Sequence, residues 1–153
     1  MTMAIQDREK AVLVTLEKLP KENVVLIGGY AVNAYVPPRF SIDCDLVVIG
    51  SSGKIETALT KNGFVKTERG NAPCGSYRYV KSEVSFDFLE NSVLGRDSGI
   101  IFEGKSSNST QKAGLLWEEV RMRMTIADAE ILFAMKFITT RKTGHKGPFH
   151  ACG

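Results

Sequence analysis

The sequence has few of the features that mark secreted, membrane-spanning or metal-clustered proteins. It contains 3 cysteines, Cys44, Cys74 and Cys152, whose odd number and irregular spacing argue against a disulfide framework or a cysteine metal site. This cysteine content favours a reducing compartment. There is no N-terminal basic segment followed by an apolar stretch, and no apolar run approaches the roughly 18 residues of a membrane span. We therefore expect a cytoplasmic protein with no membrane partner.

The excess of basic over acidic residues is also small. The net charge is +3, which by itself is too small to indicate nucleic-acid binding. The length of 153 residues predicts one domain, residues 1–153, with an ordinary content of 43% hydrophobic and 24% charged residues. The tail from about residue 141, which includes His145 and His150, is expected to be truncated or poorly ordered.

The most informative segment starts with an apolar run, Val24 to Ile27, followed by Gly28 and Gly29. The run predicts a short buried strand, and the glycines allow a sharp turn that leaves backbone N–H groups unobstructed. Tyr30 to Tyr35 is compatible with a helix, which Pro37 and Pro38 would end. Glycines between a strand and a helix N-terminus favour binding of an anion such as a phosphate.

Two aspartates follow in a second strand-like run, Ile42 to Ile49. Strand alternation places Asp43 and Asp45 on one face, and Ile42, Cys44 and Leu46 on the other. Carboxylates at this spacing can converge on Mg²⁺, which proteins bind through one or two carboxylates together with substrate phosphates. The alternative is a strand that merely ends in acidic residues, although burying two aspartates without partners is costly.

A third acid, Asp87, lies in a further alternating run, Glu83 to Leu89, which Ser82 separates from Ser76 to Lys81. The two runs predict a hairpin or a bent strand pair. Ser85, Asp87 and Leu89 would share one face, so Asp87 is a candidate metal ligand or a solvated residue on an open sheet face. Tyr77, Arg78 and Tyr79 suit base stacking or phosphate contact, but cross-strand packing explains them equally well.

The remaining pattern predicts an α+β fold, with a twisted, mostly antiparallel or mixed sheet and helices packed on one side. Helices are predicted at Ile5–Leu19, Lys54–Asn62 and Ala127–Thr140, and further strands at Phe64–Thr67, Ile100–Phe102 and Val120–Met124. The glycines and the polar run Lys105 to Lys112 predict loops through most of Asn91 to Gly114.

Gly28-Gly29, a spacer of about a dozen residues, Asp43-x-Asp45 and a later strand aspartate together resemble the signature of the DNA polymerase β-type nucleotidyltransferase superfamily. The fuller pattern, with Ala31 and with Arg39 and Ser41 before Asp43, is similar to minimal nucleotidyltransferases and AbiEii-like toxins. Those proteins usually carry Thr where this chain has Ser41. Lys136 and Arg141 are similar to a lysine and an arginine of the AbiEii-like proteins, but the acid pair that follows there has no counterpart.

The resemblance implies two-metal transfer of a nucleoside monophosphate from a nucleoside triphosphate to a hydroxyl. Asp43, Asp45 and Asp87 would be the catalytic and metal-binding residues for Mg²⁺, with Mn²⁺ as a substitute. Gly28, Gly29, Arg39, Ser41 and Lys136 would bind the nucleotide.

The sequence leaves the nucleotide and the acceptor open, the latter being an RNA 3′ end, a protein side chain or a small molecule. An antitoxin-type partner also fits the resemblance. A different class of function is a catalytically inactive module of the same fold that binds nucleotide or protein, and a third is a purely structural domain.

Overall fold

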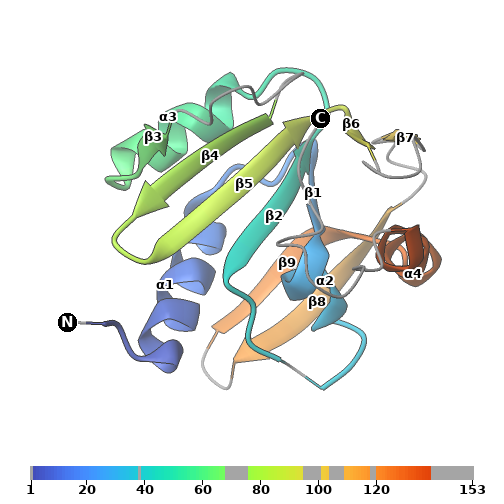
Figure 1. Ribbon diagram of the computed structural model, residues 1–153, viewed down its shortest axis with the longest axis horizontal. Coiled ribbons are helices and arrows are strands. Elements are labelled where there is room, and N and C mark those ends of the chain that lie inside the picture. The colour runs from blue at the N-terminus through green and yellow to red at the C-terminus, as the bar shows by residue number, and fades with distance from the viewer. Residues whose placement is uncertain are drawn as a thin grey trace.

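The structure is a computed structural model that describes residues 2–37, 39–67, 76–94, 101–103, 109–117 and 120–138. Within these residues helices and strands alternate as far as α3, and a run of strands from β3 to β9 then precedes the last helix (Figure 1). In chain order they are α1 (Ile5–Lys18), β1 (Val24–Ile27), α2 (Gly28–Val32), β2 (Asp43–Val48), α3 (Gly53–Lys61), β3 (Val65–Thr67), β4 (Ser76–Lys81), β5 (Val84–Glu90), β6 (Ser92–Leu94), β7 (Ile101–Glu103), β8 (Ser109–Trp117), β9 (Val120–Ala127) and α4 (Ala129–Ile138).

The main sheet is mixed and has the strand order β3-β4-β5-β2-β1-β9-β8. β2 runs parallel to β5, and β1 runs parallel to β9, while the other neighbouring pairs are antiparallel. β6 and β7 form a separate antiparallel pair. This arrangement confirms the predicted α+β fold with a mixed sheet.

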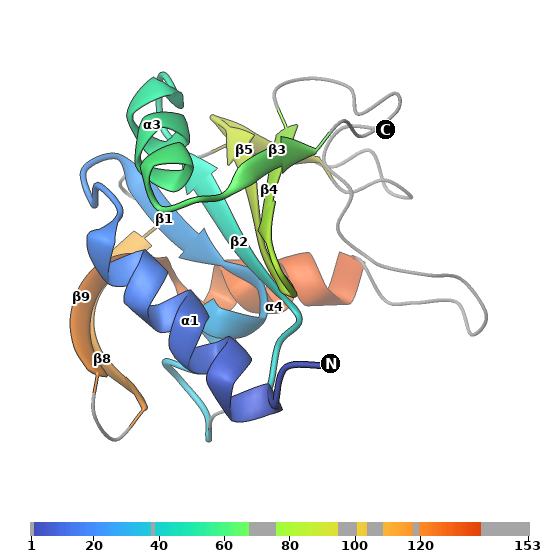
Figure 2. The same cartoon turned by 90° about the vertical axis from the view of Figure 1, so that its left-hand side faces the viewer.

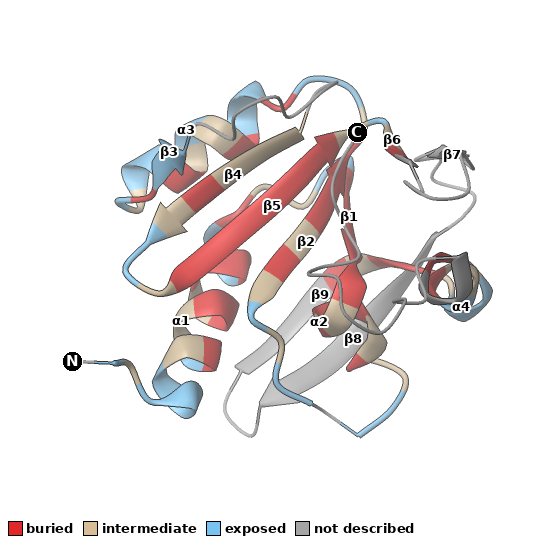
Figure 3. Cartoon of the chain, viewed as in Figure 1, coloured by how far each residue is buried: buried red, intermediate tan, exposed pale blue. Residues whose placement is uncertain are grey.

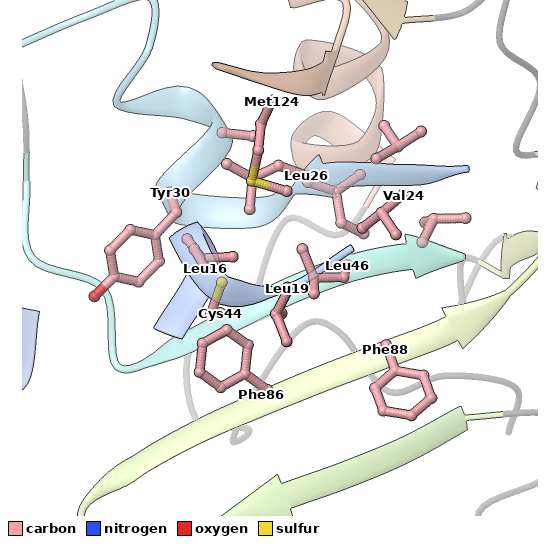
Figure 4. Close-up of a cluster of buried hydrophobic side chains, with 14 of the residues drawn as sticks. Leu16, Leu19, Val24, Leu26, Tyr30, Cys44, Leu46, Phe86, Phe88 and Met124 are labelled. Carbon is pink, nitrogen blue, oxygen red and sulfur yellow. The ribbon is translucent and has the colours of Figure 1, made fainter. Parts of the chain in front are cut away.

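The core packs against both faces of the central strands and is deepest on one of them. All residues of β1 are buried, and Cys44, Leu46, Phe86 and Phe88 are completely buried (Figure 3). Figure 4 shows these side chains of β2 and β5 on the same side as Leu16 of α1. Burying a large apolar side chain stabilises a fold by roughly 1.5–3 kcal/mol, so this layer holds β2 and β5 in place. Residues that alternate with this layer must point to the opposite face.

Helices α1 and α3 both contribute to this core. Val12, Leu13 and Leu16 of α1 recur at helical spacing and are buried, as are Ile55 and Leu59 of α3. Figure 2 shows α1 and α3 on the same side of the sheet. No helix in the described part of the chain is long and apolar enough to cross a membrane.

The structure differs from the sequence prediction at α2. The helix starts at Gly28 and ends at Val32, so it covers only part of the predicted Tyr30 to Tyr35. The next residue, Asn33, is buried and forms hydrogen bonds to the backbone of Arg39 in both directions, Nδ2 to O at 2.7 Å and N to Oδ1 at 3.0 Å. These bonds close a loop between Asn33 and Arg39, and the turn that follows α2 begins at Asn33.

The predicted loop over the polar run Lys105 to Lys112 is wrong in its second half. Ser109 begins β8, which pairs antiparallel with β9 at the end of the sheet. As an edge strand, β8 forms backbone hydrogen bonds with β9 on one side only. This pairing outweighs the low strand preference of its polar side chains. The predicted disorder of the tail, with Arg141, His145 and His150, lies outside the described residues.

Candidate functional site

A single row of residues crosses four strands of the sheet. Arg78 of β4 lies opposite Asp87 of β5, Asp87 opposite Asp45 of β2, and Asp45 opposite Ile27 of β1. Residues directly opposite each other on neighbouring strands point to the same face, with strands about 4.7–4.9 Å apart. The structure therefore brings Asp45 and Asp87 together on the face opposite the deepest part of the core.

Asp43 lies on the same face, two residues before Asp45. Its partner in the parallel register is Ser85 of β5, and the Ser85 hydroxyl donates a short hydrogen bond to Asp43 Oδ1. Sequence reasoning placed Ser85 on the face of Asp87 but gave it no role. The missing information was the β2–β5 register, which joins residues about 42 positions apart in the chain.

Arg78 is the most strongly bound side chain of the site. Its Nε donates to Asp87 Oδ1 at 2.7 Å, and its Nη2 donates to Asp87 Oδ2 at 2.6 Å. The same Nη2 is 3.4 Å from Asp43 Oδ2. The hydrogen bonds to Asp87 raise the pKa of Arg78 above its ordinary value, although partial burial opposes this. Arg78 is thus a permanent cation between two of the three aspartates.

The two tyrosines beside Arg78 were candidates for base stacking, but in the structure they pack within the protein. The ring centroids of Tyr77 and Tyr79 lie 5.3 and 5.7 Å from that of Phe88, on the core face of the sheet. The Tyr79 hydroxyl donates to Glu56 of α3 at 2.8 Å. Cross-strand packing is therefore the explanation that the structure supports for both.

Gly28 touches the site directly. Its φ is +68°, and a Cβ added there would lie 2.3 Å from Asp45 Oδ2. A Cβ on Gly29 would lie 2.5 Å from the Ser41 hydroxyl oxygen. The glycines are needed because β1 passes into α2 against these two side chains. α2 has only five residues, so it provides little helix dipole.

The loop before β2 is held to the site from several directions. The Ser41 hydroxyl donates to the backbone O of Asp43 at 3.1 Å, and the Tyr30 hydroxyl donates to the backbone O of Ser41 at 3.4 Å. Asn33 fixes the backbone of Arg39, whose side chain is exposed. Asn33 was not identified from the sequence, since a polar residue in a helix-like segment gives no sign of a partner six positions away.

The remaining predicted nucleotide ligand, Lys136, belongs to α4, but its side chain lies outside the described residues. The structure therefore does not test whether it reaches the aspartates.

The electrostatic field of the site is negative. Cys44 is completely buried beneath the aspartates, and its pKa is well above its ordinary value. Burial is the largest cause, and the charges of Asp45, Asp87 and Asp43 add to it. Cys44 is therefore a neutral thiol on the core face of β2.

The donor set fits Mg²⁺ at two of the three acids. Asp43 and Asp45 offer carboxylate oxygens on one face, and Mg²⁺ is commonly held by one or two carboxylates plus substrate phosphates. Both oxygens of Asp87 accept hydrogen bonds from Arg78. Among the described residues, no group of three or more His, Cys, Asp or Glu is arranged to hold a metal ion. The role of Asp87 as a metal ligand stays a prediction.

Solved structures of other proteins share the fold of this chain. The sequence matches no protein-family model and no curated protein. The Thermotoga maritima protein TM1012, a provisionally assigned nucleotidyltransferase, is 12% identical over 88% of this chain and 86% of its own, with a TM-score of 0.63. The lincosamide antibiotic adenylyltransferase LnuA, solved with lincomycin bound, is 14% identical over 84% of both chains, with a TM-score of 0.57.

A third solved structure, the Helicobacter pylori protein JHP933, is 18% identical over 96% of this chain and 62% of its own, with a TM-score of 0.53. At such low identity these likenesses establish the fold alone. The closer resemblance to AbiEii-like toxins stays a prediction. The chain has the nucleotidyltransferase fold.

Proposed function

We propose that this protein is an Mg²⁺-dependent nucleotidyltransferase, which transfers a nucleoside monophosphate from a nucleoside triphosphate to a hydroxyl group. The observation that carries the proposal is the placement of Asp45 beside Asp87 in the parallel register, with Asp43 next to them and Gly28 against Asp45. Catalysis of this reaction consists mainly of positioning and charge stabilisation, which such a rigid cluster suits.

The residues divide into two groups by the part of the nucleotide that they would contact. Asp43 and Asp45 would hold Mg²⁺, which would supply positive charge against the negative charge that develops during transfer. The open backbone at Gly28 and Gly29 would accept the triphosphate. Arg39, Ser41 and Lys136 would complete the nucleotide site, and the anchored loop of Asn33 supports the first two.

The proposed transfer is a displacement at the α-phosphorus. The oxygen of the acceptor hydroxyl attacks the α-phosphorus, the bond from that phosphorus to the oxygen bridging the α- and β-phosphates breaks, and pyrophosphate leaves. Asp87 takes the proton of the hydroxyl.

The likeness to LnuA makes a small molecule the first acceptor to test. LnuA is named as an adenylyltransferase of lincosamide antibiotics, and its fold covers most of this chain. An RNA 3′ end, a protein side chain and an antitoxin-type partner remain further predictions from sequence.

A second candidate function has its own supporting observation. Arg78 binds both oxygens of Asp87. A chain that has exchanged the catalytic use of this acid for an internal ion pair would bind nucleotide without transferring it.

Radiolabelled nucleotide transfer separates these two functions. The protein is incubated with Mg²⁺, each of the four α-labelled nucleoside triphosphates, and pools of antibiotics, total RNA and protein. The proposal expects a labelled acceptor with the wild type and none with Asp45→Asn. Glu83→Gln is the matched control, since it removes an acid that binds Arg8 in a separate ion pair and should leave transfer intact.

Melting curves with each nucleotide decide between the alternatives if no acceptor is labelled. A nucleotide present at 100 times its dissociation constant stabilises the folded state by about 2.7 kcal/mol. A rise in melting temperature without transfer supports the inactive binding module, and the absence of both contradicts any nucleotide function.

A further inference from the structure

The ion pair between Arg78 and Asp87 is built into the sheet. The two residues are directly opposite each other on the antiparallel strands β4 and β5. The side chain of Asp87 is 11% exposed and that of Arg78 is 28% exposed. Two parallel N–H···O contacts at 2.7 and 2.6 Å form the forked arrangement in which a guanidinium binds a carboxylate most strongly.

Arg78 also contacts Asp43, the acid with which Asp87 would share a metal ion. Its Nη2 is 2.6 Å from Asp87 Oδ2 and 3.4 Å from Asp43 Oδ2, so one nitrogen lies between the two carboxylates. A divalent ion shared by Asp87 and Asp43 would compete with this guanidinium for the same carboxylate oxygens. The exchange would break both charge-assisted hydrogen bonds of the fork and would take the carboxylate partner from a partly buried guanidinium.

The guanidinium retains the capacity to bind a further anion. Arginine keeps its charge at any physiological pH and has more N–H donors than the contacts to Asp87 and Asp43 use. A phosphate beside Asp45 would lie on the same face, one strand beyond Asp87 in the row. Arg78 can therefore neutralise Asp87 and a phosphate together.

We propose that the Arg78 guanidinium replaces one of the two divalent cations that a two-metal site would hold. The protein then binds a single divalent ion, through Asp43 and Asp45, and Arg78 supplies the second positive charge. This inference rests on the proposed function and makes it more specific.

Counting bound Mn²⁺ tests this directly and without a turnover assay. Free Mn²⁺ is measured by its electron paramagnetic resonance signal during titration of the full chain, with a non-hydrolysable nucleoside triphosphate analogue of each base. The wild type is expected to bind one Mn²⁺ per chain. Asp87→Asn should leave the affinity unchanged, while Asp45→Asn should weaken it by at least about tenfold, as expected when metal coordination is lost.

The Arg78 variants give the decisive comparison. Arg78→Met removes the guanidinium from Asp87 and Asp43, so it should gain a second Mn²⁺ site, and the double variant with Asp87→Asn should lose that site again. Arg78→Lys keeps the charge and should still bind one ion. Lys66→Met, which removes a cation that stacks on Tyr77 on the core face, should also bind one.

Two outcomes would overturn the inference in different ways. Two Mn²⁺ ions in the wild type, one of which is lost in Asp87→Asn, would show that Asp87 binds metal despite Arg78, and would leave the proposed function intact. No nucleotide-dependent Mn²⁺ binding in any variant would overturn the proposed function together with the inference. Melting curves of each variant establish that it is folded before ions are counted.

Discussion

Asp45 and Asp87 face each other across the parallel pair β2 and β5, and Asp45 is at the same time the residue against which Gly28 turns. The carboxylates and the open backbone are thus held by the same three central strands. The buried residues that alternate with them, such as Leu46 and Phe88, keep those strands in register. Because the acids point away from the most deeply buried side chains of β2 and β5, substitutions at the acids can be separated from substitutions that disturb that layer.

Replacing Gly28 by alanine should abolish nucleotide binding. The new Cβ would collide with Asp45 Oδ2, and the positive φ adds a cost of roughly 1–2 kcal/mol in stability. Gly50→Ala is the matched control, because Gly50 also has a positive φ, +91°, but nothing lies within 4 Å of its added Cβ. Calorimetric titration with nucleotide and Mg²⁺ should show binding by Gly50→Ala but not by Gly28→Ala. Equal affinity in the two variants would contradict the proposed contact between Gly28 and the site.

Replacing Asn33 by alanine should weaken both the fold and the nucleotide site. The change removes two hydrogen bonds to the backbone of Arg39, a loss of about 1–3 kcal/mol in the free energy of unfolding. Asn62→Ala, which removes one side-chain hydrogen bond at the end of α3, is the control for stability alone. Urea unfolding should show destabilisation of both variants, while only Asn33→Ala should lose affinity for nucleotide, since Arg39 and Ser41 then shift. Unchanged affinity in Asn33→Ala would remove this loop from the binding site.

Part of the site was predictable from the sequence because it depends on local alternation alone. A period of two assigns Asp43 and Asp45 to one face of β2, and Asp87 with Ser85 to one face of β5. The Gly-Gly turn was equally predictable, since few residues other than glycine adopt the positive φ found at Gly28.

The contacts between strands were harder to predict, and the Arg78–Asp87 pair shows why. Its register follows from a turn of two residues, Ser82 and Glu83, because Lys81 is paired with Val84. The sequence pattern indicated a connection of Ser82 alone, which leaves the register undetermined. The parallel contact of Asp43 with Ser85 had no local signal, since it depends on how separate segments pack.

Acid should destabilise the protein partly through Glu56, which lies on the core side. Burial alone would raise the pKa of Glu56, but hydrogen bonds from Ser52 and Tyr79 and the nearby Lys66 together lower it. The folded state therefore binds fewer protons than the unfolded state near pH 4.5, so this stabilisation is present above that pH and is lost as the pH falls through the folded-state pKa.

The measurement for this prediction is the unfolding free energy at pH 7 and at pH 3.5. Glu56→Gln should lose less stability between the two pH values than the wild type does. Glu22→Gln, a change at an exposed position before β1, should behave as the wild type. An identical loss in all three proteins would show that Glu56 makes no contribution to acid sensitivity.

The central claim is that the acidic face beside Gly28 binds a metal–nucleotide complex. Its most direct measurement is the anomalous scattering of Mn²⁺ in crystals grown with a non-hydrolysable nucleoside triphosphate. The account predicts a Mn²⁺ peak in contact with the carboxylates of Asp43 and Asp45, and triphosphate density along the backbone of Gly28 and Gly29. Well-ordered nucleotide bound elsewhere, with no Mn²⁺ at these two aspartates, would contradict it.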